Sequence, residues 1–335
     1  MQSDVASIPQ AASPRAILEM ATAFQRSRVL LTAHELDLFT LLAETWKSSA
    51  EVAKALGTDE RATDRLMNTL CSLGLLEKRD RRFSNTPPAS RFLVRGKPAF
   101  MAGLMHTAHL WDTWSTLTEA VRQGSSVVGR PIGDQGEQWL RAFIAAMHWR
   151  GCQHARDVVG WLDLSGVSRV LDVGGGSGVY AMAFARAKPD ITAVVFDLPS
   201  VVSMTQEYVA REGLSDRVKT VAGDYEVDEL GRGFDLAFLS AIIHSNSESA
   251  NRRLLRKCAE ALKPKGQLVV QDFIVDEDRT GPPFAVLFAL NMLVGTESGD
   301  TYTESEVREW MREAGLSGVG RKDTEFGTTL LIGRK

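Results

Sequence analysis

The sequence predicts an α/β protein in two parts, a mostly α N-terminal region and a C-terminal parallel sheet with helices on both faces. From residue 168 onward, short β-branched runs alternate with helical segments, which is typical of such a sheet. Before residue 95 the order is helix, turn, helix and hairpin, which is a winged-helix pattern. The 335 residues, 44% hydrophobic and 24% charged, suit about two globular domains.

The N-terminal elements follow from apolar spacing and from capping residues. We expect Val29–Leu42 to form one helix, because its apolar residues recur on one helical face. A short helix over Ser48–Gly57 should end at its glycine, and Thr58 is expected to cap the next helix, whose first turn is acidic. Two short strands, residues 75–78 and 81–85, complete the hairpin.

A winged-helix unit either binds DNA or serves as a structural and dimerisation module. Residues 1–105 hold 14 Lys and Arg against 11 Asp and Glu, a balance of only +3. The second helix mixes acidic with basic side chains, whereas a helix that enters a DNA groove usually shows a clear basic footprint. The arginines of the hairpin are the exception. The composition therefore favours dimerisation over nucleic-acid binding.

Residues 106–165 form the expected helical connector, which is rich in His, Trp and Met. Phe143 and Met147 lie one helical turn apart and are candidates for one wall of a small-molecule pocket, and Asn291 and Met292 for another wall. Apolar stripes of this kind are often ordinary core. Small-molecule pockets are also mostly apolar, so both interpretations stay open at the level of sequence.

The predicted C-terminal domain covers residues 166–335. Its strand-like runs are RVLDVGG, TAVVFDL, RVKTVAGD, FDLAFLS, QLVVQDF and TTLLIGRK. Helices are expected between them at about 178–188, 199–212 and 247–263. Cys258 falls on the apolar face of the last helix, which predicts a core position.

The loop LDVGGGSG, Leu171–Gly178, follows a strand and opens a helix, and its glycines allow a ligand to approach the backbone closely. Asp172, Asp197 and Asp224 lie near the ends of three successive strands. Because ligands of open α/β sheets bind at the carboxyl ends of strands, these carboxylates should converge. A dinucleotide site is the alternative, but its pyrophosphate needs a neutral or basic helix start. The acidic surroundings instead favour a cationic adenosyl ligand, such as S-adenosylmethionine.

Taken in order, the motifs LDVGGGSG, FDLP, GDY, IIH and LKPKGQLVVQDF resemble those of the small-molecule O-methyltransferases of the caffeic-acid and acetylserotonin type. The resemblance covers almost the whole chain. It implies a Rossmann-like domain that binds S-adenosylmethionine, a winged-helix dimerisation domain over residues 1–105, and a homodimer. It also implies transfer of a methyl group to a small, aromatic acceptor.

The resemblance implies positions around the cofactor as well. These are Gly174 and Gly176 at the methionine part, Asp197 and Leu198 at the ribose, Asp224 and Tyr225 at the adenine, and Ser240, which stands where the family often has a lysine.

His244 follows the run FDLAFLSAII and matches the family's general base, with Asp272 as the residue that orients it. A phenol has a pKa of about 10, so its methylation needs a base that works near neutral pH. The family commonly has His-Asp-Trp here, whereas this chain has Ser245 and Asn246 after the histidine, and Thr301 stands at the position of a second acid. Methylation of carbon or sulfur by the same fold is therefore an alternative, because those acceptors handle the proton differently.

Two further functions are less favoured alternatives: a winged-helix regulator that senses a ligand, and an NAD-dependent oxidoreductase. Three widely spaced cysteines predict reduced thiols in a cytoplasm and no zinc site. We see no signal peptide, and no apolar run of the roughly 20 residues that span a bilayer, so no membrane partner is expected. A net charge of −3 does not indicate a nucleic-acid partner either.

Overall fold

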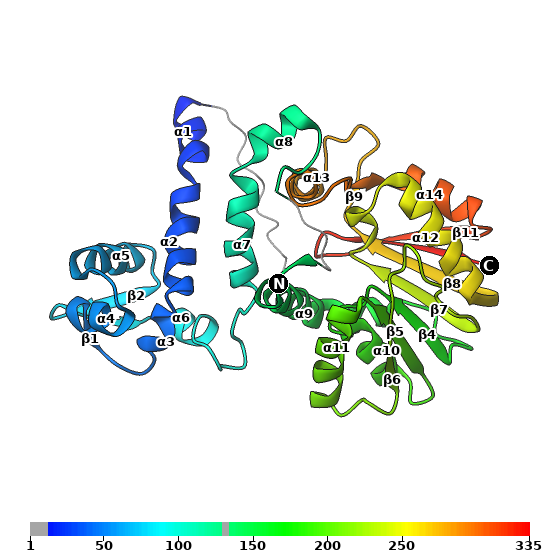
Figure 1. Ribbon diagram of the computed structural model, residues 1–335, viewed down its shortest axis with the longest axis horizontal. Coiled ribbons are helices and arrows are strands. Elements are labelled where there is room, and N and C mark those ends of the chain that lie inside the picture. The colour runs from blue at the N-terminus through cyan, green and yellow to red at the C-terminus, as the bar shows by residue number, and fades with distance from the viewer. Residues whose placement is uncertain (1–12, 129–133) are drawn as a thin grey trace. The chain divides into compact units, whose positions relative to one another are not determined.

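The computed structural model describes residues 13–128 and 134–335. The chain forms two compact units, one that extends to His109 and one from Leu110 to Lys335 (Figure 1). The second unit contains the whole of the main sheet together with the last two helices of the segment predicted as a connector.

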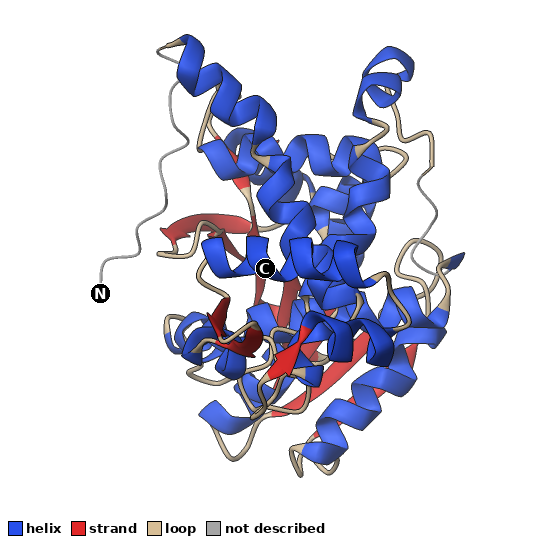
Figure 2. Cartoon of the chain, turned by 90° about the vertical axis from the view of Figure 1, so that its left-hand side faces the viewer, coloured by secondary structure: helices blue, strands red, loops and turns tan. Residues whose placement is uncertain are grey.

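The N-terminal unit is mostly helical, with one small antiparallel sheet (Figure 2). Its helices are α1 (Pro14–Thr22), α2 (Phe24–Glu35), α3 (Leu38–Leu41), α4 (Ser49–Leu56), α5 (Glu60–Ser72) and α6 (Pro87–Phe92). Its strands are β1 (Lys47–Ser48), β2 (Leu76–Arg79) and β3 (Arg82–Asn85), in the order β1-β3-β2. The predicted order of helix, turn, helix and hairpin is present in α4, α5, β2 and β3.

Two local predictions for this unit are wrong. The segment Val29–Leu42 is not one helix, because α2 ends at Glu35 and Asp37 adopts a left-handed φ of 54° before α3 begins. The apolar residues after the break still face the core, since Leu38 and Phe39 are buried. The cap of α5 is Asp59 and not Thr58, because the Asp59 carboxylate accepts a hydrogen bond from the Ala62 N–H at 2.8 Å.

The predicted helical connector is three helices, α7 (Leu104–Trp114), α8 (Leu117–Gln123) and α9 (Glu137–Gly160). In α9, Leu140, Ile144, Gly151 and Ala155 form a buried face. Gly151 allows the close approach of the next helix, because a Cβ atom there would lie 2.5 Å from Cγ1 of Val179.

The C-terminal unit is built on a seven-stranded sheet of order β11-β12-β8-β7-β4-β5-β6. The strands are β4 (Arg169–Val173), β5 (Thr192–Asp197), β6 (Val218–Ala222), β7 (Phe234–Ser240), β8 (Leu262–Asp272), β11 (Ser317–Asp323) and β12 (Thr329–Arg334). The first five are parallel to one another, and β12 pairs antiparallel with both β8 and β11. The strand order reverses direction at β4, so β4 lies at the point where open α/β sheets bind ligands.

Helices cover both faces of this sheet, as predicted. They are α10 (Val179–Ala187), α11 (Pro199–Arg211), α12 (Glu248–Ala261) and α14 (Glu304–Glu313), whereas α13 (Pro283–Gly295) packs against α8 and the short strand that follows β8. Buried clusters lie on the two sides, one that includes Leu255 and Trp310 and one that includes Phe184 and Phe238. Cys258 belongs to the first cluster and is fully buried, which confirms its predicted core position.

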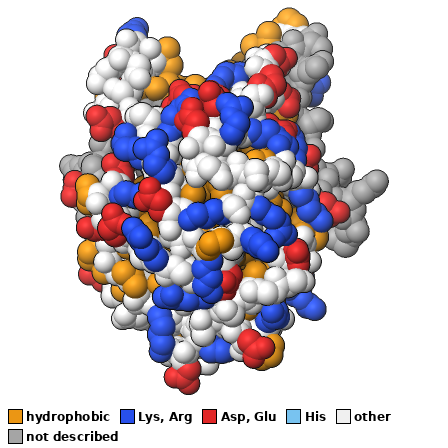
Figure 3. All heavy atoms as spheres, turned by 90° about the vertical axis from the view of Figure 1, so that its right-hand side faces the viewer, with side chains coloured by type: hydrophobic (Ala, Val, Ile, Leu, Met, Phe, Trp, Pro, Cys, Tyr) orange, Lys and Arg blue, Asp and Glu red, His pale blue; other side chains and the backbone are white. Residues whose placement is uncertain are grey.

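The shorter elements lie beyond the carboxyl ends of the strands. They are the 3-10 turn η2 (Ile243–Ser245) and the two-residue strands β9 (Ile274–Val275) and β10 (Tyr302–Thr303), which pair in parallel. On the surface shown in Figure 3, Lys and Arg side chains are interspersed with Asp and Glu. Arg252 forms ion pairs with Glu248, Glu309 and Glu313.

Gly151→Ala should destabilise the protein, although alanine is the better helix former by about 1 kcal/mol. The added methyl group collides with Val179, and such overpacking costs about 1–3 kcal/mol. Chemical denaturation measures the change in the free energy of unfolding. Gly160→Ala, in the last turn of the same helix with open space around it, is the control and should be neutral or stabilising. If Gly151→Ala matches that control, the close packing of α9 on α10 is not as described.

Candidate functional site

The loop after β4 can form only from glycines at its key positions. Gly174, Gly176 and Gly178 have φ values of 65°, 57° and 74°, which other L-residues rarely adopt. A Cβ atom on Gly175 would lie 2.6 Å from the Asp172 carboxylate, and one on Gly174 would lie 2.3 Å from the Ile242 side chain. The loop therefore leaves its backbone open to a ligand at the end of β4.

Two buried carboxylates lie beneath and beside this loop. Asp197 accepts hydrogen bonds from the Gly176 N–H at 2.7 Å and from the Leu198 N–H at 2.8 Å, and Asp172 accepts one from the Ala181 N–H at 3.1 Å. Burial raises the pKa of Asp197 to about 6 and that of Asp172 to about 7. The described residues place no Lys or Arg in an ion pair with either carboxylate. A ligand with positive charge and hydroxyl donors fits this arrangement.

Asp224 follows the neighbouring strand, as predicted. The Gly223 N–H donates to the Asp197 backbone carbonyl at 2.9 Å, which brings the ends of β5 and β6 together. The Asp224 carboxylate accepts a hydrogen bond from the Glu226 N–H at 2.8 Å. Asp172 and Asp197 lie near the ends of β4 and β5, and Asp224 follows β6, so the three acids are at one edge of the sheet, as the alternation of strands and helices indicated.

Tyr225 is tied to the loop that holds His244 through an asparagine that sequence reasoning noted only as a departure from the family. Its hydroxyl donates to Oδ1 of Asn246 at 2.9 Å. The Asn246 amide in turn donates to Asn251 at 3.1 Å, and the Asn251 amide donates to the Ile243 carbonyl at 2.8 Å. The asparagine therefore links the residue predicted at the adenine to the turn that carries the predicted base.

His244 and Asp272 form a buried pair. Nδ1 of His244 lies 2.7 Å from Oδ1 of Asp272, and the two residues are 8% and 1% exposed. Oδ1 also accepts the Phe273 N–H at 2.8 Å, so the carboxylate is fixed in place. With Asp272 ionised, Nδ1 carries the proton and donates it, and Nε2 keeps its lone pair. The ring of Phe288 meets His244 edge-on at 4.8 Å between centroids and shields it from water.

Thr301 stands at the position of the family's second acid, and it gives His244 no second carboxylate. Thr301 is buried, and its backbone carbonyl accepts a hydrogen bond from Arg279. The Asp300 N–H donates to the His244 carbonyl at 2.9 Å, while the Asp300 carboxylate lies 3.6 Å from the Arg279 guanidinium. In the described ranges, the Asp272 carboxylate is the acidic group that contacts the imidazole.

Ser240 ends β7 beside a residue that the sequence analysis missed. Its hydroxyl lies 3.3 Å from Oε1 of Gln271. Gln271 was part of a predicted strand and carried no motif of its own. Only the pairing of β7 with β8 brings the two side chains together.

The residues predicted to line a pocket have different surroundings. Phe143 stacks on Trp139 at 5.3 Å and packs beside Leu198, and Met147 is half-buried one turn later. The Asn291 side chain accepts a hydrogen bond from Trp114 Nε1 at 2.8 Å, so α13 is anchored to α7. Met292 is buried. The role of all four in acceptor binding stays a prediction.

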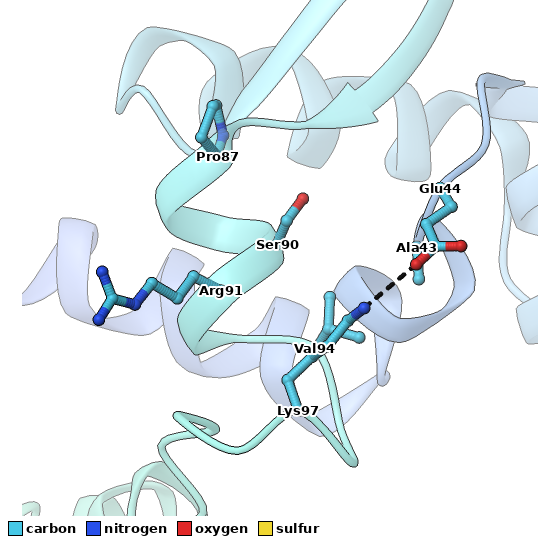
Figure 4. Close-up of a pocket in the computed structure, with 7 residues that line it drawn as sticks. All are labelled: Ala43, Glu44, Pro87, Ser90, Arg91, Val94 and Lys97. Carbon is cyan, nitrogen blue, oxygen red and sulfur yellow. Dashed lines mark hydrogen bonds and ion pairs between the residues drawn. The ribbon is translucent and has the colours of Figure 1, made fainter.

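A surface pocket of about 370 Å³ lies elsewhere, in the N-terminal unit (Figure 4). It is lined by Ala43, Glu44, Pro87, Ser90, Arg91, Val94 and Lys97. An ion pair of 3.1 Å between Lys97 and Glu44 crosses one side of it. None of the predicted site residues lines this pocket, so we assign it no ligand.

Within residues 13–128 and 134–335, no three His, Cys, Asp or Glu side chains are grouped so that they could hold a metal ion. None of the described helices is both long and apolar enough to cross a bilayer.

Comparison with known proteins agrees with the geometry. Residues 114–317 match the model of the O-methyltransferase domain, and residues 18–95 match that of the O-methyltransferase dimerisation domain. A 3-hydroxy-5-methyl-1-naphthoate 3-O-methyltransferase of Streptomyces sahachiroi is 35% identical over 93% of this chain and 92% of its own length. Bovine acetylserotonin O-methyltransferase is 32% identical over 95% of this chain and 96% of its own length. The structure of human N-acetylserotonin methyltransferase with S-adenosylmethionine has a TM-score of 0.85, with 28% identity over 98% of this chain and 99% of that one.

Binding of S-adenosylhomocysteine should weaken in acid. The sequence predicts that the ribose diol donates to ionised Asp197, and burial raises the pKa of this carboxyl to about 6, so affinity should fall as pH drops through that value. At about pH 5, roughly a tenth of Asp197 stays ionised, which raises Kd roughly tenfold relative to pH 8. Calorimetry measures Kd from pH 5 to 8. Asp197→Asn should bind weakly at every pH and lose the titration near pH 6. A Kd that is flat with pH in the unmodified protein would contradict this role of Asp197.

Proposed function

The chain belongs to the O-methyltransferase family, and on that premise we propose that His244 removes the proton of a phenolic hydroxyl while the methyl group is transferred to its oxygen. The enzyme is an S-adenosylmethionine-dependent methyltransferase, and the cofactor supplies the methyl group. The observation that carries the assignment of the base is the hydrogen bond of 2.7 Å between His244 and Asp272.

The geometry supports a general base for three reasons. Asp272 fixes the tautomer in which Nε2 is the proton acceptor. The carboxylate also stabilises the imidazolium that forms once the proton is taken, because opposite charges attract strongly at a buried site. Phe273 and Phe288 lie against the imidazole and exclude water from it. A base placed in this way typically contributes 10²–10⁴-fold to the rate.

The acceptor class and the cofactor contacts are part of the same proposal. The similar proteins named above act on a hydroxynaphthoate and on acetylserotonin, which supports an aromatic acceptor. The candidates to contact it are Phe143, Met147, Asn291 and Met292. Around the cofactor we propose Gly174 and Gly176 at the methionine part, with the ribose at Asp197 and Leu198, the adenine at Asp224 and Tyr225, and Ser240 nearby.

His244→Ala should lower kcat for a phenolic acceptor by about 10²–10⁴-fold, with little change in Kd for S-adenosylhomocysteine. Asp272→Asn should also lower kcat, because it no longer holds the tautomer that leaves Nε2 free. Transfer of a radiolabelled methyl group to phenols, thiols and electron-rich heterocycles measures the rates. Ser245→Ala, directly beside the base, is the matched control. Label on carbon or sulfur, or a His244→Ala variant as fast as its control, would disprove the assignment.

We propose that the N-terminal unit dimerises and does not bind nucleic acid. Helix α1 exposes Ile17, Leu18 and Met20 by 55%, 64% and 54%, which is costly for a free surface. Two of the hairpin arginines are engaged within the unit, since Arg79 pairs with Glu77 and Arg82 with Glu51. The three free cysteines of the chain are in keeping with our placement of the enzyme in a reducing cytoplasm.

The unmodified chain should sediment at about twice its mass of 36.7 kDa. Leu18→Glu places a charge in the apolar face of α1 and should raise the dimer dissociation constant by at least about tenfold. Analytical ultracentrifugation over a range of concentrations measures it. Glu19→Ala, at the next position, should stay dimeric. An unmodified chain that is monomeric at all concentrations would rule the dimer out, and a Leu18→Glu variant as dimeric as the control would move the interface away from α1.

A further inference from the structure

Asn246 lies at the centre of a buried hydrogen-bond network that joins the loop after β6 to the turn after β7. Its Oδ1 accepts a hydrogen bond from the Tyr225 hydroxyl at 2.9 Å, and its Nδ2 donates to Oδ1 of Asn251 at 3.1 Å. Its backbone carbonyl accepts a hydrogen bond from the Tyr302 hydroxyl. Asn246 and Asn251 are 5% and 0% exposed, so water competes little for these bonds.

The direction of each side-chain hydrogen bond in this network is fixed by the turn that carries His244. The Ile243 carbonyl, directly before the histidine, can only accept, so the Asn251 amide that contacts it at 2.8 Å must donate. Oδ1 of Asn251 then faces Asn246 and needs a donor, which is Nδ2 of Asn246. Asn246 is left with Oδ1 toward Tyr225, whose hydroxyl must donate. The orientation of the Tyr225 hydroxyl is therefore set from the turn that holds the base.

Position 246 needs a side chain that both accepts and donates. The Tyr225 hydroxyl keeps its proton near neutral pH, because burial raises its pKa to about 12, so it needs an acceptor. Oδ1 of Asn251 needs a donor. A residue of similar size without polar atoms, such as leucine, would leave both groups buried and unpaired, which is costly. Tryptophan, common at this place in the family, accepts no hydrogen bond, so the link is a feature of this chain.

Other contacts hold the main chain on both sides of the network. Nζ of Lys257 donates to the backbone carbonyls of Tyr225 at 2.9 Å and of Asp228 at 3.0 Å. The hydrogen bond from Tyr302 reaches the backbone of Asn246 and does not involve its side chain. Loss of the Asn246 side chain should therefore leave both segments folded and release the orientation of the side chains that they present.

We propose that Asn246 is a positioning residue that couples the cofactor site to the base: an adenine packed against Tyr225 stabilises, through Asn246 and Asn251, the turn that presents His244. This inference rests on the proposed function, which assigns the adenine to Tyr225 and the base to His244. Cofactor binding and placement of the base are then thermodynamically linked, and both weaken when the link is cut. A buried chain of paired side chains is a physical route for such coupling.

The test is a double-mutant cycle on Tyr225→Phe and Asn246→Leu. The first removes the hydroxyl and keeps the ring, and the second removes both polar groups of the asparagine. Each should raise Kd for S-adenosylhomocysteine and lower kcat at saturating cofactor, by about 3- to 30-fold. Because both substitutions cut the same link, the double variant should be no worse than Asn246→Leu alone. Calorimetry measures Kd, and transfer of a radiolabelled methyl group to a phenol measures kcat.

The effect of Tyr225→Phe on kcat separates the inference from a local role at the adenine. A hydroxyl that served the adenine site alone would change Kd and leave kcat at saturating cofactor unchanged. Tyr208→Phe is the matched control, because it removes from a half-buried tyrosine a hydroxyl that makes no hydrogen bond in the described part of the chain. It should change neither quantity. The inference is overturned if Tyr225→Phe lowers cofactor affinity alone, or if the effects of the two substitutions multiply in the double variant.

Failure of the inference and failure of the proposed function give different results. If His244→Ala lowers kcat as expected while Tyr225→Phe and Asn246→Leu act independently, the proposed base stands and the link does not. If His244→Ala is as fast as the unmodified enzyme, the base and the link that positions it both fall.

Discussion

The carboxyl ends of the parallel strands meet at one edge of the sheet, and every polar group of the candidate site depends on that constraint. The glycine loop follows β4, Asp197 ends β5, Asp224 follows β6, Ser240 ends β7 and Asp272 ends β8. If one of these strands ran antiparallel to the others, its residue would lie at the opposite edge of the sheet. The reversal of strand order at β4 separates the acids after β5 and β6 from the histidine pair beyond β7 and β8.

Asn246 joins these two halves. Tyr225 follows β6, and His244 lies on the turn after β7, but both are held by the same asparagine and its partner Asn251. A tryptophan, common at this place in the family, could not accept a hydrogen bond from Tyr225. The replacement therefore changes how the turn is fixed and leaves the contact between His244 and Asp272 intact. That is a physical reason to regard the departure from the family pattern as compatible with O-methylation.

The parts of the site that the sequence predicts are those that follow from strand ends. Asp172, Asp197, Asp224 and His244 could be placed because each follows a β-branched run, and parallel strands put such residues at one edge. Contacts between distant segments could not be placed in this way. Ser240 meets Gln271 only through the pairing of β7 with β8, and Tyr225 meets Asn246 only because the loops after β6 and β7 come together in the fold. The break within Val29–Leu42 could not be predicted from the sequence either, because the apolar periodicity continues across the turn at Asp37.

The two acids nearest the glycine loop have no cationic partner in the described part of the chain. Burial raises the pKa values of Asp172 and Asp197, because it disfavours their ionised forms. Salt bridges to neighbouring side chains would offset that cost, as they do for the exposed acids that pair with Arg141 and Arg252 elsewhere in the unit. Leaving the two acids unpaired lowers the stability of the free protein. The same arrangement would give binding energy and orientation to a ligand with a cationic sulfonium, which is how preorganised charges favour the bound state.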